Sequence, residues 1–563
     1  MFIVYQYNMD SSFKLPIEYL EKKHLINDNV KKDLELVCFE DPDKQVYKKM
    51  FGLNNYNILN ESKWNTYFTS DIDYLKDTQK LLCEEELPKP VDCEKSINIY
   101  KETKTSKEGF IHKYDYIEYD MLKPLNENSN FLQFFSLYNI SSPIISFITP
   151  VLFLIMPFFI MKLQGHIITV KNYFDVLIKI VKNHSIGKLF TMESEMPFTK
   201  KLYILFSFGF YIFQIYQNVL YSKRFLKNML HIHEELFTIR DFIKNTIENM
   251  DKMCELELKT YLPFFENIKL QRDKLEVIIN EIINISIPEL SINKISELGN
   301  IMKLFYKMYM NDSYKDTIEY AIYFNGYLEN MNTIKDKITN NVMNKCNFNK
   351  KVSFKNAYFV EYENKENVKN TYNINKNMLI TGPNASGKTT MLKTTMLNII
   401  LSQQIGCGYY SSADMNPYQH IHSYINIPDT SGRDSLFQSE ARRCKDILET
   451  IDSFHNDRHF CIFDELFSGT NPTEATASSY GFLSYIKKYK NVNCMITTHF
   501  IKLCKLLKKD IESIYMDAIL ENGTIQYLYK MKRGVSSVNG GIQVLKDIGF
   551  PEDMLQYTLK IKK

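Results

Sequence analysis

The chain lacks an excess of charge of either sign. Its 563 residues contain 69 lysines and arginines against 66 aspartates and glutamates, which leaves a formal net charge of +3. Because no global basic field surrounds the protein, any contact with a nucleic-acid backbone must come from a local patch. The chain is too long for one hydrophobic core, and a typical domain length of about 150 residues predicts three or four units.

Closely spaced cysteines and a secretory signal are also missing. Ten cysteines are scattered along the chain, and none forms a C-x-x-C pair. This spacing argues against a zinc site and against a disulfide framework, so it favours a reducing compartment, the nucleus or the cytoplasm. Residues 1–14 lack the charged start and the long apolar core of a secretory signal, and we therefore expect an intracellular protein.

The first part of the chain is polar and predicts helices. Within residues 1–130, the apolar side chains of the segments 15–37 and 64–87 recur at spacings of three and four, which is the helical period. The segment 41–52 predicts a short helix that stops at Gly52. No catalytic motif is visible here, so we expect a helical N-terminal region.

Two apolar segments follow within residues 131–221. The segment 143–161 has no charged residue over about the length that crosses a bilayer, and the segment 202–221 is a second candidate, although three amide side chains weaken its far end. Lysines flank both segments. Two interpretations remain: a transmembrane hairpin that anchors the protein with both termini on one side, or two buried helices of a helical domain. Three prolines in the first segment fit neither interpretation readily.

Residues 222–347 predict long, charged helices. Apolar positions repeat at helical spacing, and one stretch of more than fifty residues has no glycine, which favours helices packed as a lever. His231 and His233 lie two residues apart, so they cannot share a helix face as metal ligands would. We expect them to be surface or packing residues.

A phosphate-binding loop is predicted further along the chain, between Thr381 and Thr390. The pattern G-x-x-x-x-G-K-[ST] fits residues 382–389, after a strand-like apolar run and before a helix-like segment. Its two glycines let the backbone N–H groups approach phosphates closely. Lys388 would reach the β- and γ-phosphate oxygens, and the Thr389 hydroxyl would bind Mg²⁺. The loop therefore predicts ATP and Mg²⁺ as ligands.

Two further apolar strands end in residues suited to phosphate chemistry. The segment 459–470 carries Asp464, which we assign to Mg²⁺, and Glu465, which we assign as the general base that polarises the attacking water. The segment 494–500 carries His499, whose imidazole could bond the γ-phosphate or that water. Standing alone, a histidine at such a place is more often structural.

Together with the segments 402–413 and 431–443, these motifs resemble the MutS family of DNA mismatch-repair ATPases. That family has a G-P-N phosphate loop, a glutamine-glycine loop, an S-x-F-x-x-E signature, a D-E-[LIV]-x-x-G-T strand and a T-H-[YF] switch, and the resemblance covers residues 351–551. The matching residues are Gly382-Pro383-Asn384, Gln404 with Gly406, Ser435 with Phe437 and Glu440, Asp464-Glu465-Leu466 with Gly469-Thr470, and Thr498-His499-Phe500.

The resemblance implies a site and a dimer. Glu465, His499 and Lys388 would be catalytic, and Thr389 and Asp464 would hold Mg²⁺. Residues 541–551 are similar to the family's dimerisation tail, which implies a homodimer or heterodimer on double-stranded DNA. The nucleotide-binding residues it implies are Gly382, Pro383, Asn384, Ala385, Ser386, Gly387, Lys388, Thr389, Thr390, Asn370, Gln404 and, in trans from the partner subunit, Ser435.

The N-terminal half departs from the family. Repair members read mismatches with a phenylalanine in an F-x-E context, and no convincing equivalent is present near the start; Phe264-Phe265-Glu266 lies in the helical lever, where we interpret it as coincidence. Ala385 and Ser386 stand where the repair branch has methionine and glycine.

The predicted fold is a multidomain α plus α/β chain. We expect an ATP-driven dimeric clamp acting in DNA mismatch repair or related DNA maintenance. The alternatives are a membrane-associated MutS-like ATPase without mismatch recognition and a protein that only clamps duplex DNA. The predicted parts are a helical N-terminal region (1–130), the apolar segments (131–221), a helical lever (222–347), an ABC-like P-loop ATPase domain (348–535) and a short dimerisation tail (536–563).

Overall fold

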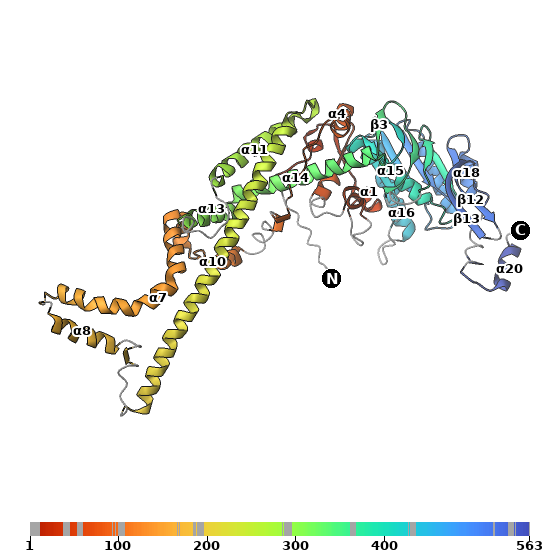
Figure 1. Cartoon of the computed structure of the whole chain (residues 1–563). Coiled ribbons are helices and arrows are strands. Elements are labelled where there is room, and N and C mark those ends of the chain that lie inside the picture. Colours follow the sequence, from red (N-terminus) through yellow and green to blue (C-terminus); the bar gives the residue numbers. More distant parts are fainter. Residues whose placement is uncertain are drawn as a thin grey trace. The chain divides into compact units, whose positions relative to one another are not determined.

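The fold was obtained as a computed structural model and is mixed α/β, with long helices and several sheets (Figure 1). The chain forms two compact units: unit 1 contains Met1–Val91, Glu248–Arg272 and Ile322–Lys563, and unit 2 contains Asp92–Ile247 and Asp273–Ala321. The structure describes residues 12–37, 45–52, 60–92, 94–95, 97–98, 107–165, 167, 169–183, 187–188, 196–283, 285, 296–360, 367–425, 427, 435–521, 524–538, 545–546 and 548–561.

A six-stranded sheet forms the centre of unit 1. Its order is β13-β12-β6-β11-β10-β9, and all neighbours are parallel except the β12–β13 hairpin. The strands that we predicted before the phosphate loop, before Asp464 and before His499 are confirmed as β6, β10 and β11. The bounds are β6 (Met378–Thr381), β9 (His420–Tyr424), β10 (His459–Asp464), β11 (Val492–Thr497), β12 (Glu512–Glu521) and β13 (Thr524–Arg533).

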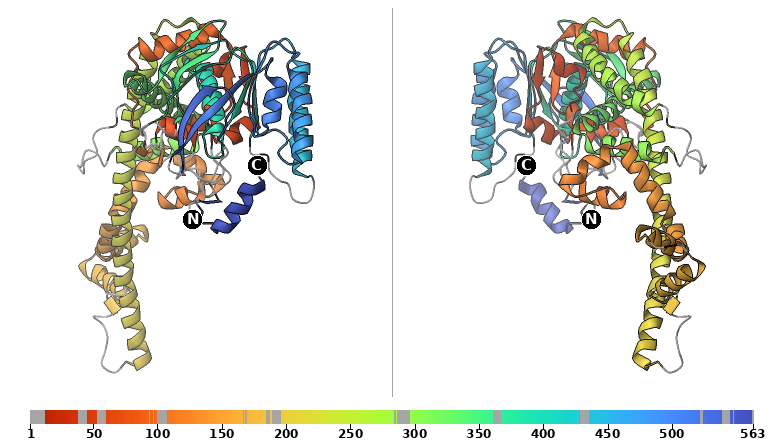
Figure 2. Two further views of the ribbon diagram at one scale, coloured as in Figure 1. Left: turned by 90° about the vertical axis from the view of Figure 1, so that its right-hand side faces the viewer. Right: turned by 90° about the vertical axis from the view of Figure 1, so that its left-hand side faces the viewer.

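Helices cover both faces of this sheet (Figure 2). Alternate residues of a strand point to opposite faces, so Cys461 and Phe463 of β10 pack with helices α16, α17 and α18, while α15 contacts β10 and β11 from the other side. The bounds are α15 (Lys388–Gln404), α16 (Leu436–Ser453), α17 (Pro472–Ile486), α18 (Ile501–Leu507) and, after the sheet, α20 (Glu552–Ile561).

A smaller sheet in unit 1 has the order β5-β4-β8-β3-β7. Strand β3 runs parallel to β8, and the other neighbours are antiparallel. The bounds are β3 (Asn344–Phe348), β4 (Ser353–Ala357), β5 (Asn370–Asn373), β7 (Cys407–Gly408) and β8 (Ser412–Met415).

The N-terminal part of unit 1 is less helical than its periodicity indicates. Two short strands, β1 and β2, pair antiparallel inside stretches that we predicted as helix, so that prediction is wrong at these residues. The predicted stop at Gly52 is confirmed, because α2 ends there at a left-handed φ of 93°. The bounds are η1 (Pro16–Tyr19), β1 (Lys23–Leu25), α1 (Asp28–Asp33), α2 (Val46–Phe51), α3 (Glu61–Trp64), β2 (Tyr67–Thr69) and α4 (Ile72–Cys83).

Long helices make up unit 2 and the segments of unit 1 that continue from it along the chain. Within unit 2, α13 packs along α7. The phenylalanine pair Phe264 and Phe265 is buried in α11, which fits our interpretation of that motif as packing. The bounds are α6 (Lys107–Lys113), η4 (Asp120–Glu127), α7 (Ser129–Leu163), α8 (Val170–Asn183), α10 (Phe198–Cys254), η5 (Lys259–Tyr261), α11 (Leu262–Ile282), α13 (Leu298–Met310) and α14 (Asp312–Thr339).

The two predicted apolar segments lie within α7 and α10. By length and apolar composition, one helical stretch among the described residues could cross a bilayer, and it is Ser129–Thr149 of α7. The segment 202–221 of α10 is not among such stretches. Helix α7 is continuous through Pro143, Pro150 and Pro157.

A cluster of histidines is packed at the β9 edge of the main sheet. The rings of His420, His422 and His459 are stacked, and His422 Nε2 lies 3.2 Å from His459 Nδ1. Burial, followed by the neighbouring His459 and His420, lowers the pKa of His422 to about 3. Burial lowers the pKa of His459 as well. The folded chain therefore favours the neutral form of the His422 and His459 imidazoles.

We expect the free energy of unfolding to fall as the pH drops below about 6.5. Between that pH and about pH 3, His422 is protonated in the unfolded chain but stays neutral in the folded chain, so acid favours the unfolded state. His422 alone should contribute a slope of about 1.4 kcal/mol per pH unit between pH 6 and 4. Denaturant titrations at several pH values measure this slope. The His422→Leu variant should show a shallower slope, whereas His455→Leu, at an exposed position nearby, should keep it; equal slopes in all three proteins would contradict the assignment.

Candidate functional site

The loop between β6 and α15 adopts a conformation that only a few residues tolerate. Gly382 and Gly387 have φ values of 155° and 90°, and Ala385 has a φ of 61° in the left-handed region. A Cβ on Gly382 would lie 2.7 Å from Ser386 Oγ, so glycine is required there. Gly387 is the N-cap of α15 and has no side chain to cap it. The first N–H groups of α15 are thus available to an anion.

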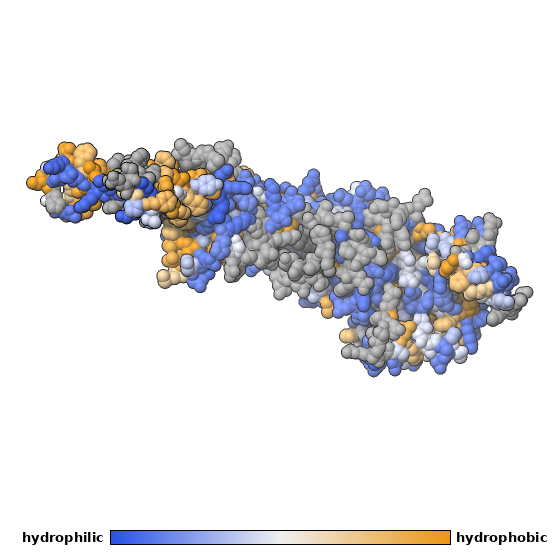
Figure 3. Space-filling view, turned by 90° about the horizontal axis from the view of Figure 1, so that it is seen from below, coloured by the Kyte–Doolittle hydropathy of each residue, from blue (hydrophilic) through white to orange (hydrophobic). Residues whose placement is uncertain are grey.

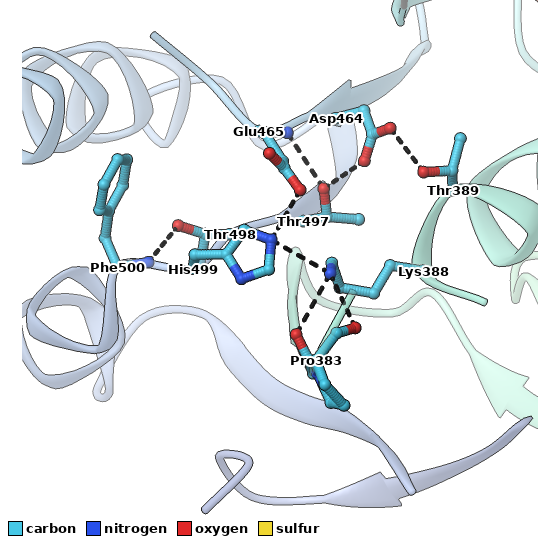
Figure 4. Close-up of polar contacts among 10 residues, drawn as sticks. Pro383, Lys388, Thr389, Asp464, Glu465, Thr497, Thr498, His499 and Phe500 are labelled. Atoms are coloured by element: carbon cyan, nitrogen blue, oxygen red, sulfur yellow. Dashed lines mark hydrogen bonds and ion pairs between the residues drawn. The ribbon is translucent and has the colours of Figure 1, made fainter. Parts of the chain in front are cut away.

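Lys388 is a buried cation without a paired anion in this loop (Figure 4). Its side chain is 6% exposed, and Nζ donates to the carbonyls of Gly382 and Pro383 at 3.2 Å each. Among the described residues, no carboxylate lies within ion-pair distance of Nζ. Burial lowers the pKa of Lys388, and the charges of Glu465 and Asp464 act in the opposite direction. A bound anion would supply the missing countercharge.

Asp464 lies at the end of β10, directly opposite the start of α15. Its Oδ2 accepts a hydrogen bond of 2.7 Å from Thr389 Oγ1, and its Oδ1 accepts one from Thr497 of β11. The Thr497 hydroxyl in turn accepts from the Glu465 N–H at 3.0 Å. Sequence reasoning missed Thr497. Its signal is the strand register, because Asp464 and Thr497 are paired residues of neighbouring parallel strands.

Glu465 and His499 are in contact at the same edge of the sheet. Glu465 has a left-handed φ of 54°, and its Oε1 lies 2.8 Å from His499 Nε2. The hydrogen bond from His499 lowers the pKa of Glu465. Lys388 Nζ is 3.3 Å from the same Nε2. His499 Nε2 cannot donate a hydrogen bond to Glu465 and accept one from Lys388 at the same time. When Nε2 donates to Glu465, the Lys388 ammonium has no bond to His499 and can donate to an anion instead.

A cavity of about 590 Å³ opens beside the loop, a volume typical of small-ligand sites. Two buried polar atoms of residues that line it, Ser386 Oγ and Asn367 Oδ1, have no hydrogen-bond partner among the residues that the structure describes. Tyr529 adds an aromatic wall beside Gly387. The lining residues are Ala357, Tyr358, Phe359, Asn367, Val368, Asn370, Asn384, Ala385, Ser386, Gly387, Lys388, Thr389, Thr390, Met391, Thr394, Glu465, Met516 and Tyr529.

The predicted Asn370 reaches this cavity, but its amide is engaged elsewhere. Its Nδ2 donates to the Tyr529 carbonyl at 2.9 Å, and its Oδ1 accepts from the Met531 N–H at 2.8 Å. The side chain therefore ties β5 to β13 and positions Tyr529. Asn367, three residues earlier and without such partners, is the better placed amide for a ligand.

Gln404 and Ser435 lie outside the cavity lining. Gln404 is 1% exposed at the far end of α15, where its Nε2 donates to the carbonyls of Trp64 and Tyr67, so the structure places it in the core and not beside a ligand of this subunit. Ser435 is exposed at the N-cap of α16. Glu440 of the same helix accepts hydrogen bonds from Ser468 and Gly469, which follow β10. Of the predicted tail, residues 541–544 lie outside the described residues.

The arrangement suits a polyphosphate with a divalent cation. The unpaired Lys388, the free N–H groups of α15 and the orphaned Ser386 hydroxyl are donors for an anion. Thr389 and Asp464 present two oxygens at bonding distance, which fits Mg²⁺ held by few protein ligands. Glu465, kept ionised by His499, is an acceptor for the proton of a water molecule.

Comparison with known proteins gives matches to the C-terminal third of the chain. A family model described as MutS domain V matches residues 378–563. The chain is 28% identical over 182 residues to the DNA mismatch repair protein MutS of Lactococcus lactis subsp. cremoris and to that of Streptococcus suis, which covers 32% of this chain and 21% of each relative. The protein of the same name from Streptococcus agalactiae is 28% identical over 181 residues, 31% of this chain and 20% of the relative. The matched region thus spans about a fifth of these relatives.

Because the loop presents donors without an anion, we expect inorganic pyrophosphate with Mg²⁺ to stabilise the protein. At ten times its dissociation constant the ligand adds about 1.4 kcal/mol, or roughly 2 °C in Tm. Lys388→Met should lose this shift, whereas Lys393→Met, on the same helix but outside the cavity lining, should retain it. A Lys388→Met protein that pyrophosphate still stabilises to the same extent would remove Lys388 from the anion site.

Proposed function

Residues 378–563 of this chain belong to the MutS family, and from this premise we propose that the protein is a Mg²⁺-dependent ATPase that closes as a dimer around double-stranded DNA. The single observation that carries the proposal is the convergence of Lys388, Glu465 and Asp464 at one edge of the sheet. Lys388 follows β6, whereas Asp464 and Glu465 stand at the end of β10, far along the sequence, and each has the chemistry that ATP hydrolysis requires.

The residues at the loop fit ATP. Lys388 and the backbone of 383–387 would hold the β- and γ-phosphates, and Thr389 with Asp464 would hold Mg²⁺, which neutralises charge on the phosphates when bound. The cavity beside the loop has room for the nucleoside. Asn367 offers a free carbonyl oxygen to a base or ribose donor, and the Tyr529 ring offers a face for stacking.

Glu465 is the residue that we assign to the attacking water. Its hydrogen bond to His499 keeps it ionised near neutral pH, so it can accept a proton or orient a water molecule. His499 thereby holds Glu465 in place, and a change in the anion at Lys388 is sensed by the imidazole between them. This coupling supports the assignment of His499 as a switch that reports the state of the nucleotide.

A dimer would complete each site. Ser435 is exposed at the N-terminus of an 18-residue helix, and Glu440 joins that helix to the turn after β10. In a dimer, Ser435 of one subunit would contact the γ-phosphate of the nucleotide bound to the partner subunit. The N-terminus of α16, which carries Ser435, favours negative charge there. The exposed apolar residues Ile548, Phe550 and Tyr557 around α20 support a contact between subunits, which are identical or related chains.

The role in DNA is proposed from the family. The relatives that match this chain are DNA mismatch repair proteins, and we infer that this chain acts in mismatch repair or related DNA maintenance inside the cell, in the nucleus or the cytoplasm. The free thiols of the eight described cysteines support a reducing compartment. The alternative is a membrane-associated ATPase that does not recognise mismatches, and the exposed apolar helices of unit 2 favour it as a second candidate.

We predict that Glu465→Gln binds ATP with nearly wild-type affinity but hydrolyses it at least about 100-fold more slowly, because the amide cannot accept the proton. The variant should accumulate as an ATP-bound dimer, which sedimentation detects. Glu474→Gln is the matched control, since Glu474 is exposed on α17 and its carboxylate accepts a hydrogen bond from Thr470, outside the cavity lining. Retained turnover in Glu465→Gln would remove the general-base role, and a protein that stays monomeric with ATP would refute the composite site.

We predict that duplex DNA stimulates ATP turnover of the full-length protein severalfold at fixed, low salt, because the clamp closes around it. Turnover without DNA, with matched duplex and with mismatched duplex should be measured in parallel. Additional stimulation by the mismatch would support repair. Equal stimulation by both duplexes would support a clamp that ignores mismatches, and indifference to both would favour the membrane-associated alternative.

A further inference from the structure

Unit 2 exposes an unusually large apolar surface, which we call the apolar arm: residues 143–163 of α7, all of α8 and residues 198–222 of α10. Figure 3 shows hydrophobic residues gathered over this part of unit 2. Phe147 is 74% exposed, and Phe206 is 71% exposed. The other exposed apolar residues of the arm include Ile144, Ile145, Ile148, Leu152, Ile155, Phe158, Phe159, Phe174, Ile178, Leu202, Leu205, Phe210, Ile212 and Phe213.

The run 143–161 of α7 is apolar on every side of its helix, and much of it is exposed. In α7 the exposed residues include Ile144, Ile145, Phe147 and Ile148, and in α10 they include Leu202, Tyr203, Leu205 and Phe206, whereas Ile204 is buried. A helix that packs on a protein core has an apolar stripe on one side, whereas one that is apolar all round belongs inside a core or a bilayer. The all-round apolar composition of the run 143–161 therefore favours a bilayer as the occupant, since this surface is not inside a core.

By length alone the two uncharged runs match a bilayer. The stretch that also has the apolar composition is Ser129–Thr149, which overlaps the first run, and Gln214, Gln217 and Asn218 make the second run less apolar. The run 143–161 has 19 residues, or about 28 Å of helix, and the run 202–222 has 21 residues, or about 31 Å, against about 30 Å for the hydrocarbon core. Lys162 follows the first run, and Lys201 precedes the second. Both runs thus end in cations at their connected ends, where the headgroups would lie.

Two backbone carbonyls that prolines of α7 leave without a helical partner are satisfied as they are in lipid. Proline has no N–H, so Pro143 leaves the Asn139 carbonyl without its helical partner, and Ser142 Oγ donates to that carbonyl at 3.1 Å. Pro150 leaves the Ser146 carbonyl in the same way, and the Tyr211 hydroxyl of α10 donates to it at 3.0 Å. Water could serve such carbonyls at an exposed surface, but a bilayer cannot.

The side-chain polar groups within the run 143–161 are satisfied too. Ser146 Oγ donates to the Ser142 carbonyl and accepts from Asn218 Nδ2 of α10 at 2.6 Å. Thr149 Oγ1 donates to the Ile145 carbonyl. Hydrogen bonds between apolar helices of this kind are the usual device for joining helices inside a membrane.

Helix α8, between the two runs, is amphipathic. Lys171, Lys179 and Lys182 fall on one side, and Val170, Phe174 and the other apolar residues fall on the opposite side, and none of residues 170–182 is buried. Such a helix suits the plane of the headgroups. The connection 162–201 carries seven lysines against three acidic residues, so it fits anionic lipid.

We propose that the apolar arm inserts into an anionic phospholipid bilayer, with the runs 143–161 and 202–222 in the hydrocarbon and α8 among the headgroups on the side where the two runs are connected. The rest of the chain then lies on the other side, together with the nucleotide site. The attachment is independent of ATP turnover, so the two proposals can fail separately.

The test is a flotation assay. The full-length protein is mixed with lipid in detergent, the detergent is removed so that vesicles form, and the vesicles are floated on a density gradient. One lipid mixture is phosphatidylcholine alone, and the other contains about one fifth phosphatidylserine. The wild-type protein should float with the anionic vesicles and remain with them after extraction at alkaline pH. Phe206→Asp/Phe210→Asp should be released by that extraction, because two carboxylates would enter the hydrocarbon. Leu270→Asp, at an exposed apolar position of α11, should float as the wild type does.

The lysines of α8 are tested separately. Lys171→Gln/Lys179→Gln/Lys182→Gln should need at least about tenfold more anionic lipid for the same bound fraction, because each lysine near the surface adds attraction. Pyrophosphate protection of every variant should match that of the wild type, which shows that unit 1 is folded. The proposal is overturned if the wild-type protein stays in the soluble fraction with both lipid mixtures, if the double aspartate variant resists extraction, or if the arm instead joins two copies in a detergent-free oligomer that does not float.

Discussion

The site depends on the parallel pairing of three strands, β6, β11 and β10. Parallel neighbours end at the same edge of a sheet, so the loops that follow them meet there. The register is equally important, because Thr497 is paired with Asp464 on one side and with Ile380, the residue before Thr381, on the other. A shift of β11 by one residue would turn Thr497 to the opposite face and separate its hydroxyl from both carboxylate residues.

The local parts of the site could be predicted from the sequence. An apolar run followed by glycines, lysine and threonine describes a strand, a loop and a helix within about twenty residues, and the acidic and histidine strand ends are equally local. Thr497 and Asn367 could not be found in this way. The role of Thr497 follows from the register of β11 against β10, and that of Asn367 from a buried side-chain oxygen that has no hydrogen-bond donor among the described residues. Gln404 shows the converse: its place in a motif predicted a ligand, but distant carbonyls of Trp64 and Tyr67 hold it.

The strands β1 and β2 and the two apolar segments show another limit. Helical periodicity in the N-terminal part was overridden at six residues by an antiparallel pair whose partners are more than forty residues apart. The sequence of the apolar runs is compatible with buried helices and with membrane helices, because helices of both kinds are apolar on every side. What separates the two cases is which atoms cover the side chains, and only the fold contains that information.

The glutamines at the end of α15 bear on how much of the chain can fold alone. Gln403 donates to the Thr69 carbonyl at 2.9 Å, and Gln404 donates to those of Trp64 and Tyr67, so the helix that begins at the phosphate loop ends among N-terminal residues. A fragment starting at residue 348 would expose this buried helix end and deprive its amides of acceptors. A piece that keeps the end of α15 covered must therefore include Trp64, Tyr67 and Thr69, so the N-terminal segment, which the chain makes first, supports the helix that carries Lys388 and Thr389.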